Sequence, residues 1–269
     1  MSLPVALTIA GSDSGAGAGI QADLKTFAAF GVYGVTVITA ITAQNTVGVQ
    51  AVQEVEPEII RAQVDALADD FEIRGLKTGM LSSAAIIGVV AAGIRRHRLQ
   101  PLVVDPVMVA KSGDRLLQAD AVDALRRQLL PLARVVTPNI PEAEVLTGVA
   151  IRSREDRLKA ARAILGFGAQ SVIIKGGHAP DDPVIDLLVD EKGATPFSAP
   201  RVQTNHTHGT GCTFSAAVAA GLALGLSLAE AVAEAREYLS LALRNAPGLG
   251  HGHGPLQHFP VREGLHALR

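Results

Sequence analysis

The chain is poor in cysteine and in aromatic residues. Its 269 residues include one cysteine and no tryptophan, and aromatic residues make up 3% of the total. One cysteine cannot form a disulfide within the chain, which is typical of proteins in a reducing compartment. Few aromatic side chains also argue against a platform for stacked nucleic-acid bases. We therefore expect a cytoplasmic protein.

An excess of charge is absent as well. The 24 lysines and arginines are nearly balanced by 26 aspartates and glutamates, so the net charge is −2. A protein that binds nucleic acid needs a basic surface that neutralises phosphates, and this balance does not indicate one. We expect no nucleic-acid partner.

Long apolar runs are missing too. The N-terminal sequence MSLPVALTIAGSD has no basic residues ahead of its short apolar run, as a signal peptide would require. Residues 214–226 are apolar but rich in alanine and glycine, and they are shorter than the roughly 18 residues of a membrane span. We expect this segment to form a buried helix and the protein to have no membrane contact.

Short apolar runs alternate with helical patterns along the chain, and 48% of the residues are hydrophobic. Helices are expected between predicted strands at 5–10, 35–41, 76–79, 102–105, 134–137, 171–175 and 184–189. Strands that are almost entirely apolar are typical of a parallel sheet covered on both faces. The pattern predicts a three-layer α/β/α sandwich with a mostly parallel central sheet, formed by a single domain over residues 1–269.

The expected helices carry recognisable start and stop signals. Pro57 opens a helical pattern over 57–71, and similar patterns cover 83–95 and 120–130. Ser153 and Ser227 each precede an acidic residue by three positions, which is a capping-box pattern. By contrast, residues 32–55 hold two strand-like segments with no helix between them, which form either a sheet edge or a small lid.

Polar side chains gather where the predicted strands end. In an open α/β sheet, ligands bind just beyond the carboxyl ends of the strands. If the strands are parallel, one crevice collects Asp13, Gln44, Asp105, Asn139, Glu142 and Lys175. The alternative is that polar residues follow strands because turns are polar.

The glycine-rich segment GSDSGAGAGIQADLKT, residues 11–26, leads into a helix. It lacks the Gly-Lys of a P-loop and the glycine spacing of a dinucleotide fingerprint. Its glycines still allow a ligand to approach the backbone closely. Asp23 falls near the first turn of the helix, where a carboxylate serves either a ligand or the helix dipole.

The segment HGTGC, residues 208–212, precedes the alanine-rich helix. Gly209, Thr210 and Gly211 would place free N–H groups at a helix N-terminus, which is an anion site. Cys212 would lie in the first turn, where the pKa of a thiol is lowered. The alternative for Cys212 is a small buried residue in a tight turn.

Two further groups of residues remain open from pattern alone. Asn139 and Glu142 flank a helix start, where Glu142 can simply complement the dipole, and Asp105 can simply end a strand. The histidines at 206 and 208 lie too close to a turn to predict a metal. The sequence GLGHGHGPLQHF (248–259) indicates a glycine-rich terminal segment more than a metal-binding tail.

Several of these stretches together resemble one family. They are LTIAGSDSGAGAGIQADLKT, TAITAQNTVGVQ, KTGML, DPVMVAKSGDRLL, TPNIPEAEVLTG, IKGGH and NHTHGTGCTFSAA. They are similar to the bacterial hydroxymethylpyrimidine/phosphomethylpyrimidine kinases of thiamine biosynthesis, in the ribokinase-like superfamily near the pyridoxal kinases. The resemblance covers about residues 3–260.

The resemblance implies a ribokinase-like fold and a reaction in two steps. ATP would phosphorylate the hydroxymethyl group of 4-amino-5-hydroxymethyl-2-methylpyrimidine, and a second ATP would convert the monophosphate to the diphosphate. ATP and Mg²⁺ are the implied cofactors, and a homodimer is the implied assembly.

The resemblance also implies roles for individual residues. Gln44 would bind the amino and ring-nitrogen edge of the pyrimidine, in a pocket lined by Gly11, Asp23, Met80 and Val107. ATP would be bound by Asn139, Lys175 and Thr207, and Mg²⁺ would lie near Asp105 and Glu142. Gly209, Thr210 and Gly211 would form the anion hole with Cys212 as the base, and residues 110–117 would close over the site.

One motif departs from the wider superfamily. Most ribokinase-like sugar kinases have Gly-Thr-Gly-Asp, whereas this chain has the Gly-Thr-Gly-Cys that is usual in the pyrimidine-kinase branch. A pyridoxal or pyridoxine kinase on the same fold is the nearest alternative. A regulator that binds nucleotide without catalysis is another, although it would not need the full set of transfer residues.

Overall fold

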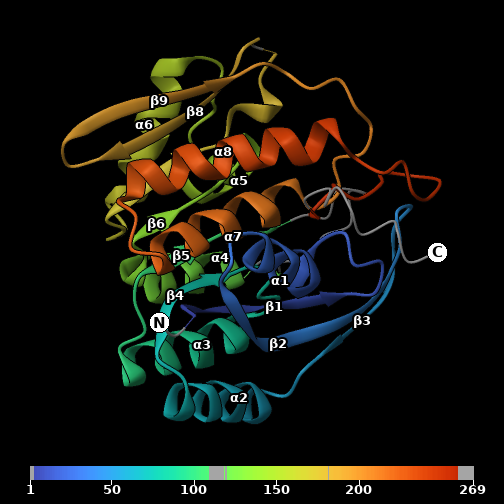
Figure 1. The fold of residues 1–269 in the computed structure, drawn as a ribbon. Helices are drawn as coiled ribbons and strands as arrows, with labels where there is room; N and C mark the ends of the chain where they lie inside the picture. Colours follow the sequence, from blue (N-terminus) through green and yellow to red (C-terminus); the bar gives the residue numbers. More distant parts are fainter. Residues whose placement is uncertain (1–2, 109–117, 119, 181, 260–269) are drawn as a thin grey trace, which may run out of the picture.

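A nine-stranded sheet runs through the described part of the computed structural model, which covers residues 3–108, 118, 120–180 and 182–259 (Figure 1). Every pairing from β2 to β7 across the sheet is parallel, whereas β3, β8 and β9 are antiparallel to their neighbours. The strands in spatial order are β3 (Val49–Glu54), β2 (Tyr33–Gln44), β1 (Val5–Asp13), β4 (Ile73–Thr78), β5 (Leu102–Val104), β6 (Val135–Val136), β7 (Ser171–Ile174), β8 (Val184–Asp190) and β9 (Gly193–Ala199).

Helices cover both faces of this sheet (Figure 1). One face packs against α1 (Gly19–Ala29), α7 (Thr210–Ala223) and α8 (Leu228–Arg244). The other face packs against α2 (Pro57–Asp70), α3 (Ala84–His97), α4 (Ala121–Ala124) with its continuations η1 (Leu125–Leu129) and η2 (Leu130–Leu132), α5 (Ile140–Thr147) and α6 (Arg154–Leu165). A short 3-10 turn, η3 (Gly176–His178), follows β7.

Covered faces explain why the central strands β5 and β6 are apolar throughout. In β5, Val103 packs against the α7 side while its neighbours Leu102 and Val104 pack against the α3 side. Successive side chains of a strand point to opposite faces, so a strand between two helical layers buries every residue. The three-layer sandwich predicted from the sequence is confirmed.

The helix boundaries follow the signals in the sequence. Ser227 and Glu230 form a capping box at the start of α8, and the hydroxyl of Ser153 accepts a hydrogen bond from the N–H of Asp156. The alanine-rich α7 is buried along almost its whole length between the sheet and α8. Among the described residues, none of the helices has the length and apolar character needed to cross a membrane.

Two features of the sheet differ from the expectation. The apolar run at 184–189 is β8, which is antiparallel, and its partner β9 was not predicted. The two strand-like segments within 32–55 are β2 and the antiparallel edge strand β3, so they form a sheet edge. The segment 110–117, predicted to close over the site, lies outside the described residues.

Candidate active site

A cavity of about 610 Å³ opens at the carboxyl ends of the parallel strands. Its wall brings together residues that are far apart in the chain, from β1 at one end to the start of α7 at the other. All but one of the predicted site residues line it: Gly11, Gln44, Met80, Asp105, Val107, Asn139, Glu142, Lys175, Thr207, Gly209, Thr210, Gly211 and Cys212. The exception is Asp23.

The start of α7 forms one wall of the cavity. Gly209 is the N-cap and has a φ of 81°, and a Cβ at this position would overlap the carbonyl oxygen of Gly17. The first backbone hydrogen bond of α7 runs from the N–H of Thr213 to the carbonyl of Gly209. The N–H groups of Gly211 and Cys212 therefore come before the regular bonding pattern, as an anion site requires.

A buried ion pair lies next to this helix start. Lys175 Nζ donates to Asp105 Oδ1 at 3.0 Å, and Asp105 is 2% exposed. A Cβ added to Gly211 would lie 3.3 Å from Lys175 Nζ and 3.5 Å from Asp105 Oδ2. The first turn of α7 thus faces the ends of β5 and β7 directly, and glycine at 211 leaves the space between them open.

Glu142 is the second acidic group of this region. Its Oε2 accepts a hydrogen bond from the N–H of Asn139 at 2.7 Å, and Asn139 Oδ1 accepts one from the N–H of Glu142 at 2.9 Å. Burial raises the pKa of the Glu142 carboxyl to about 7, although Lys175 opposes the rise. Burial by itself lowers the pKa of Lys175, but the charges of Asp105 and Glu142 outweigh it and raise that pKa.

This donor set fits a hard divalent cation that also binds substrate oxygens. Glu142 has one oxygen, Oε1, without a hydrogen-bond partner among the described residues, and both carboxylates line the cavity. Mg²⁺ commonly uses one or two carboxylates together with phosphate oxygens and water. The described residues contain no group of three or more His, Cys, Asp or Glu side chains able to hold a metal on their own. A metal held here would therefore need ligands from the substrate.

The expected thiolate at Cys212 is corrected by the structure. Burial raises the pKa of the Cys212 thiol to about 11, and the nearby Asp23 and Asp105 add to the rise while Lys77 opposes it. The effect of the helix N-terminus is smaller than the cost of ionising a buried thiol between two carboxylates. The thiol is therefore protonated near neutral pH.

Asp23 lies behind the cavity wall rather than on it. It is fully buried, and its carboxylate pairs with Lys77 Nζ at 2.9 Å and accepts a hydrogen bond from the Thr8 hydroxyl at 2.6 Å. Lys77, which does line the cavity, was missed because it lies within the strand rather than after its carboxyl end. Burial works against its charge, but the neighbouring groups, Asp23 first among them, together outweigh burial and raise the pKa of Lys77.

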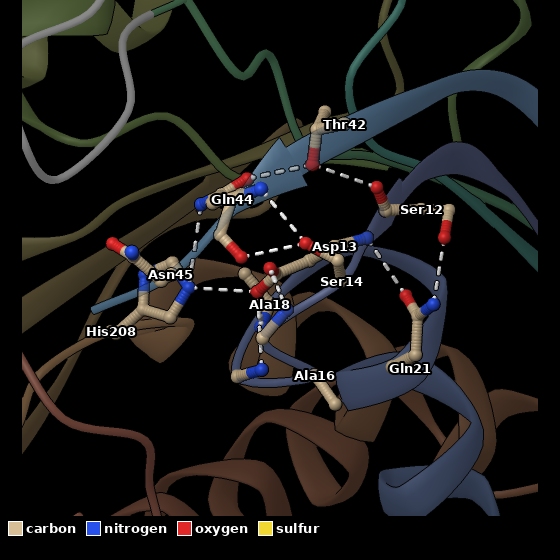
Figure 2. Close-up of polar contacts among 12 residues, drawn as sticks. Ser12, Asp13, Ser14, Ala16, Ala18, Gln21, Thr42, Gln44, Asn45 and His208 are labelled. Atoms are coloured by element: carbon tan, nitrogen blue, oxygen red, sulfur yellow. Dashed lines mark hydrogen bonds and ion pairs between the residues drawn. The ribbon is translucent and has the colours of Figure 1, made fainter. Parts of the chain in front are cut away.

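The other end of the cavity is formed by β1, β2 and the chain after β4. Gly11 lies beside Met80, since a Cβ on Gly11 would be 3.2 Å from Met80 Sδ. Gln44, the last residue of β2, has its side-chain amide between Thr42 Oγ1 at 3.2 Å and His208 Nε2 at 3.4 Å (Figure 2). Because His208 immediately precedes Gly209, Gln44 and the helix start of α7 are neighbours.

His208 is the second functional residue that the sequence did not identify. Its Nε2 lies 2.8 Å from Asp13 Oδ2, and the side chain is 9% exposed. Asp13 Oδ2 also accepts hydrogen bonds from the N–H groups of Gly17 and Ala18 (Figure 2). The glycine-rich loop after β1 therefore wraps around one carboxylate, which holds the histidine in place.

One cavity of this ribokinase-like sandwich combines a helix N-terminus, an acid–lysine pair and a pocket for a small molecule. Together these features define a small-molecule kinase. A family model described as phosphomethylpyrimidine kinase matches residues 13–257. The chain belongs to this family.

Curated relatives are similar over nearly the full length. The hydroxymethylpyrimidine/phosphomethylpyrimidine kinase of Rhizobium meliloti is 54% identical, over 95% of this chain and 97% of the relative. The protein of the same name from Bacillus subtilis is 49% identical, over 97% of each chain.

Solved structures of high similarity include pyridoxal kinases. The ADP complex of Bacillus subtilis pyridoxal kinase has a TM-score of 0.89 and 42% identity, and the match covers 96% of this chain and 98% of that one. Staphylococcus aureus pyridoxal kinase with AMP-PCP and pyridoxal has a TM-score of 0.88 and 38% identity, with coverage of 96% and 94%. The predicted ribokinase-like fold is confirmed by these neighbours.

Proposed function

We propose that this chain uses ATP to phosphorylate 4-amino-5-hydroxymethyl-2-methylpyrimidine, and then phosphorylates the resulting monophosphate to the diphosphate. Membership of the phosphomethylpyrimidine kinase family and the names of its full-length relatives support both steps. Neighbouring kinases crystallised with ADP and AMP-PCP support ATP as the phosphoryl donor.

The observation that carries this proposal is the contact between Gln44 and His208. It ties a side-chain amide at the end of β2 to the start of α7, 164 residues further along the chain. A group suited to an aminopyrimidine and a group suited to a phosphate thus share one cavity. Transfer between two bound molecules requires this proximity.

Phosphoryl transfer depends mainly on positioning and on the stabilisation of charge. The N–H groups of Gly211 and Cys212 hold the transferred phosphoryl group, and each such donor is worth about 2.7–4 kcal/mol where it has been measured in other enzymes. Lys175 neutralises phosphate charge beside Asp105. Asp105 and Glu142 would hold Mg²⁺, which would supply further neutralisation of phosphate charge. In the same assignment, Asn139 and Thr207 bind ATP.

The acceptor is held by its polar edge. The Gln44 amide carries both a donor and an acceptor, which match the ring nitrogen and the amino group of a 4-aminopyrimidine. Gly11, Met80 and Val107 line the pocket around the ring. Asp23 contributes from behind the wall by holding Lys77.

The two acceptors differ in how much they need a base. The hydroxymethyl group must lose a proton during transfer, and assistance from a base is typically worth about 10²–10⁴-fold. The monophosphate is already ionised at neutral pH and needs little such assistance. The thiolate form of Cys212, a small fraction near neutral pH because the thiol pKa is raised to about 11, takes the proton in the first step.

Two assays test the proposal. ADP release should depend on the pyrimidine alcohol, and chromatography of the products should show the monophosphate first and the diphosphate later. Lys175→Met, which removes the cation beside Asp105, should reduce turnover by at least 10²-fold. ADP release that is equal with and without the pyrimidine would reject the proposal.

Pyridoxal is a second candidate acceptor, because pyridoxal kinases are among the most similar solved structures. The same ADP assay with pyridoxal measures this activity. We expect a kcat/KM for the aminopyrimidine at least tenfold above that for pyridoxal, since Gln44 offers an amide that pairs with an aminopyrimidine edge. The reverse order would assign the chain to pyridoxal phosphorylation.

We further propose that the chain forms a homodimer through the edge of the sheet at β3. The strand β3 lies at the edge of the sheet, where its outer side is available for pairing with another chain. Ile41, Val47 and Val52 on this β2–β3 ribbon are 56%, 65% and 45% exposed. Light scattering should give twice the mass of the chain, 27.9 kDa, and Val52→Lys should shift the protein toward the monomer. A monomer at all concentrations would contradict this assembly.

A further inference from the structure

His208 lies between two polar side chains, Asp13 at the end of β1 and Gln44 at the end of β2. Its Nε2 lies 2.8 Å from Asp13 Oδ2 and 3.4 Å from Gln44 Nε2 (Figure 2). One imidazole nitrogen holds at most one proton, so it cannot satisfy both neighbours in every protonation state. Which neighbour receives the proton decides how the Gln44 amide is presented to the cavity.

Asp13 requires that proton. Its two carboxylate oxygens accept hydrogen bonds from the backbone N–H groups of Gly15, Gly17 and Ala18, at 2.8, 3.1 and 2.8 Å. These donors favour the ionised form of Asp13. A lone pair on His208 Nε2 at 2.8 Å would face a carboxylate oxygen without a proton between them, which is repulsive. The Nε2 atom must therefore carry a hydrogen.

A protonated His208 Nε2 is a donor, and the NH₂ group of Gln44 is also a donor. The contact of 3.4 Å between them is then mismatched. On the other side, the Thr42 hydroxyl donates to the carbonyl of Ser12 at 2.9 Å, so its oxygen remains able to accept. Rotating the Gln44 amide by half a turn brings its oxygen toward His208 and its NH₂ toward Thr42, and every donor then has an acceptor.

We propose that His208 is a positioning residue for the acceptor: its Nε2–H, donated mainly to Asp13 Oδ2, also faces Gln44 and holds the amide with the oxygen on the His208 side and the NH₂ on the Thr42 side. This inference rests on the proposed function, because it concerns how Gln44 recognises an aminopyrimidine. The two ends of an amide have nearly the same shape, so hydrogen-bond partners determine its orientation. The amide oxygen and the NH₂ group of Gln44 then face the cavity in a fixed order. This order determines the orientation in which the amino group and ring nitrogen of the aminopyrimidine can bind.

The surroundings hold the imidazole in this place. The N–H of His208 donates to the carbonyl of Gly254 at 3.1 Å. A Cβ on Gly17 would overlap the ring at Cδ2, so the loop after β1 packs directly on it. The first contact fixes the backbone of His208, and the second keeps the ring from turning away from Asp13 without displacement of this loop.

The first test measures the proton directly. In the full-length protein with ¹⁵N-labelled histidine, the imidazole nitrogen shifts of His208 should show a protonated Nε2, either in the neutral Nε2–H tautomer or in the imidazolium form. His208→Gln identifies the resonance by its loss. A neutral ring with the proton only on Nδ1 would overturn the proposal.

The second test measures discrimination. The ratio of kcat/KM for the aminopyrimidine alcohol to that for its analogue with oxygen in place of the 4-amino group reports the amide orientation. His208→Leu should reduce this ratio by about 10-fold or more, whereas His208→Gln, which retains an N–H donor, should keep it within about threefold. His251→Leu, at an exposed histidine of the C-terminal segment, should match the wild type.

The outcomes separate this proposal from the proposed function. An unchanged ratio in His208→Leu, or an equal loss in the glutamine and leucine variants, would overturn the positioning role while pyrimidine-dependent ATP turnover continues. If the wild type shows no pyrimidine-dependent turnover, the proposed function fails. The tautomer measurement still accepts or rejects the orientation of the network in that case.

Discussion

Cys212 needs to lose its own proton before it can accept one from the substrate. With a thiol pKa of about 11, roughly one molecule in 10⁴ carries the thiolate at pH 7. The thiolate is nonetheless the only form that acts as a base. The rate of the first transfer should therefore depend on pH in a way that the second does not.

Replacing Cys212 separates the two transfers. We expect Cys212→Ala to slow phosphorylation of the alcohol by about 10²-fold, and that of the monophosphate by no more than about threefold. In the wild type, kcat/KM for the alcohol should rise by close to tenfold per pH unit between pH 7 and 9, and this rise should vanish in the variant. Quench-flow or steady-state assays with each purified acceptor measure both effects.

Cys212→Ser is the matched control, because it keeps a small polar side chain but has a far higher pKa. It should be as slow as the alanine variant in the first transfer. Equal losses in both transfers, or recovery by serine, would point to a steric or hydrogen-bonding role in the anion site.

Gln44 should affect one substrate only. Gln44→Leu removes the donor and the acceptor that pair with the aminopyrimidine edge, so we expect KM for the pyrimidine to rise by about 10- to 100-fold. KM for ATP should stay within about threefold. Gln53→Leu, an exposed glutamine on β3, is the control, and an unchanged pyrimidine KM in Gln44→Leu would remove Gln44 from the pocket.

The sequence predicted most of the residues that line the cavity, but it did not predict all of the side chains that pair with them. Gln44, Asp105 and Lys175 were predicted from their positions at strand ends, which is a rule of parallel sheets. Lys77 was not, because its pairing with Asp23 depends on how α1 packs on β4. His208 was missed for the same reason, since its contacts come from the ends of β2 and β1, 164 and 195 residues away in the chain.

At the scale of elements, the start of α7 depends on a glycine in the left-handed region. Gly209 and Gly225 lie at opposite ends of this helix with similar φ values of 81° and 87°. A Cβ on Gly209 would overlap the Gly17 carbonyl, whereas a Cβ on Gly225 would have nothing within 4 Å. The two positions therefore separate the effect of backbone strain from that of a steric clash.

Both alanine variants are expected to lose stability, but only one should lose function. Gly225→Ala should reduce the free energy of unfolding by about 1–2 kcal/mol and leave kcat/KM unchanged. Gly209→Ala should cost more and reduce kcat/KM for both acceptors by at least 10²-fold, because the N–H groups of the first turn move. Urea unfolding and steady-state kinetics provide the comparison, and normal kinetics in Gly209→Ala would show that this turn is not the phosphate site.

Helices were easier to predict than the last strands. Caps and prolines are local signals, and they correctly marked the starts of α2, α6 and α8. The segment Gly193–Ala199 carries a glycine and Pro196 and is largely exposed, so it lacks the apolar pattern of a strand. It is an edge strand, where proline is tolerated, and only its pairing with β8 defines it.

Strand direction belongs to the whole molecule and cannot be read from a single apolar run. The strand β8 is mostly apolar because it is largely buried, as the parallel strands are, but it runs antiparallel to β7. The parallel core from β2 to β7 is what places distant residues at one edge of the sheet. The position of the cavity therefore follows from the order and direction of the strands. The residue types that line it could be predicted from the sequence.

The burial of Glu142 links the site to the stability of the whole molecule. Its carboxyl pKa is about 7 in the folded chain, against an ordinary value of 4.5. Between these values the folded state binds more protons than the unfolded state, so stability falls as the pH rises from 4.5 through 7. Full ionisation of this one buried group costs roughly 3 kcal/mol.

Glu142→Gln should remove this pH dependence. Glutamine at the third helical position still completes the capping box with Asn139, so α5 is retained. We expect the fall in unfolding free energy between pH 5 and pH 8 to be roughly 2–3 kcal/mol larger in the wild type than in the variant. Urea unfolding at both pH values measures it, with Glu155→Gln at the exposed start of α6 as the control. Identical pH dependence in the wild type and Glu142→Gln would mean that the folded-state pKa of Glu142 is not raised to about 7.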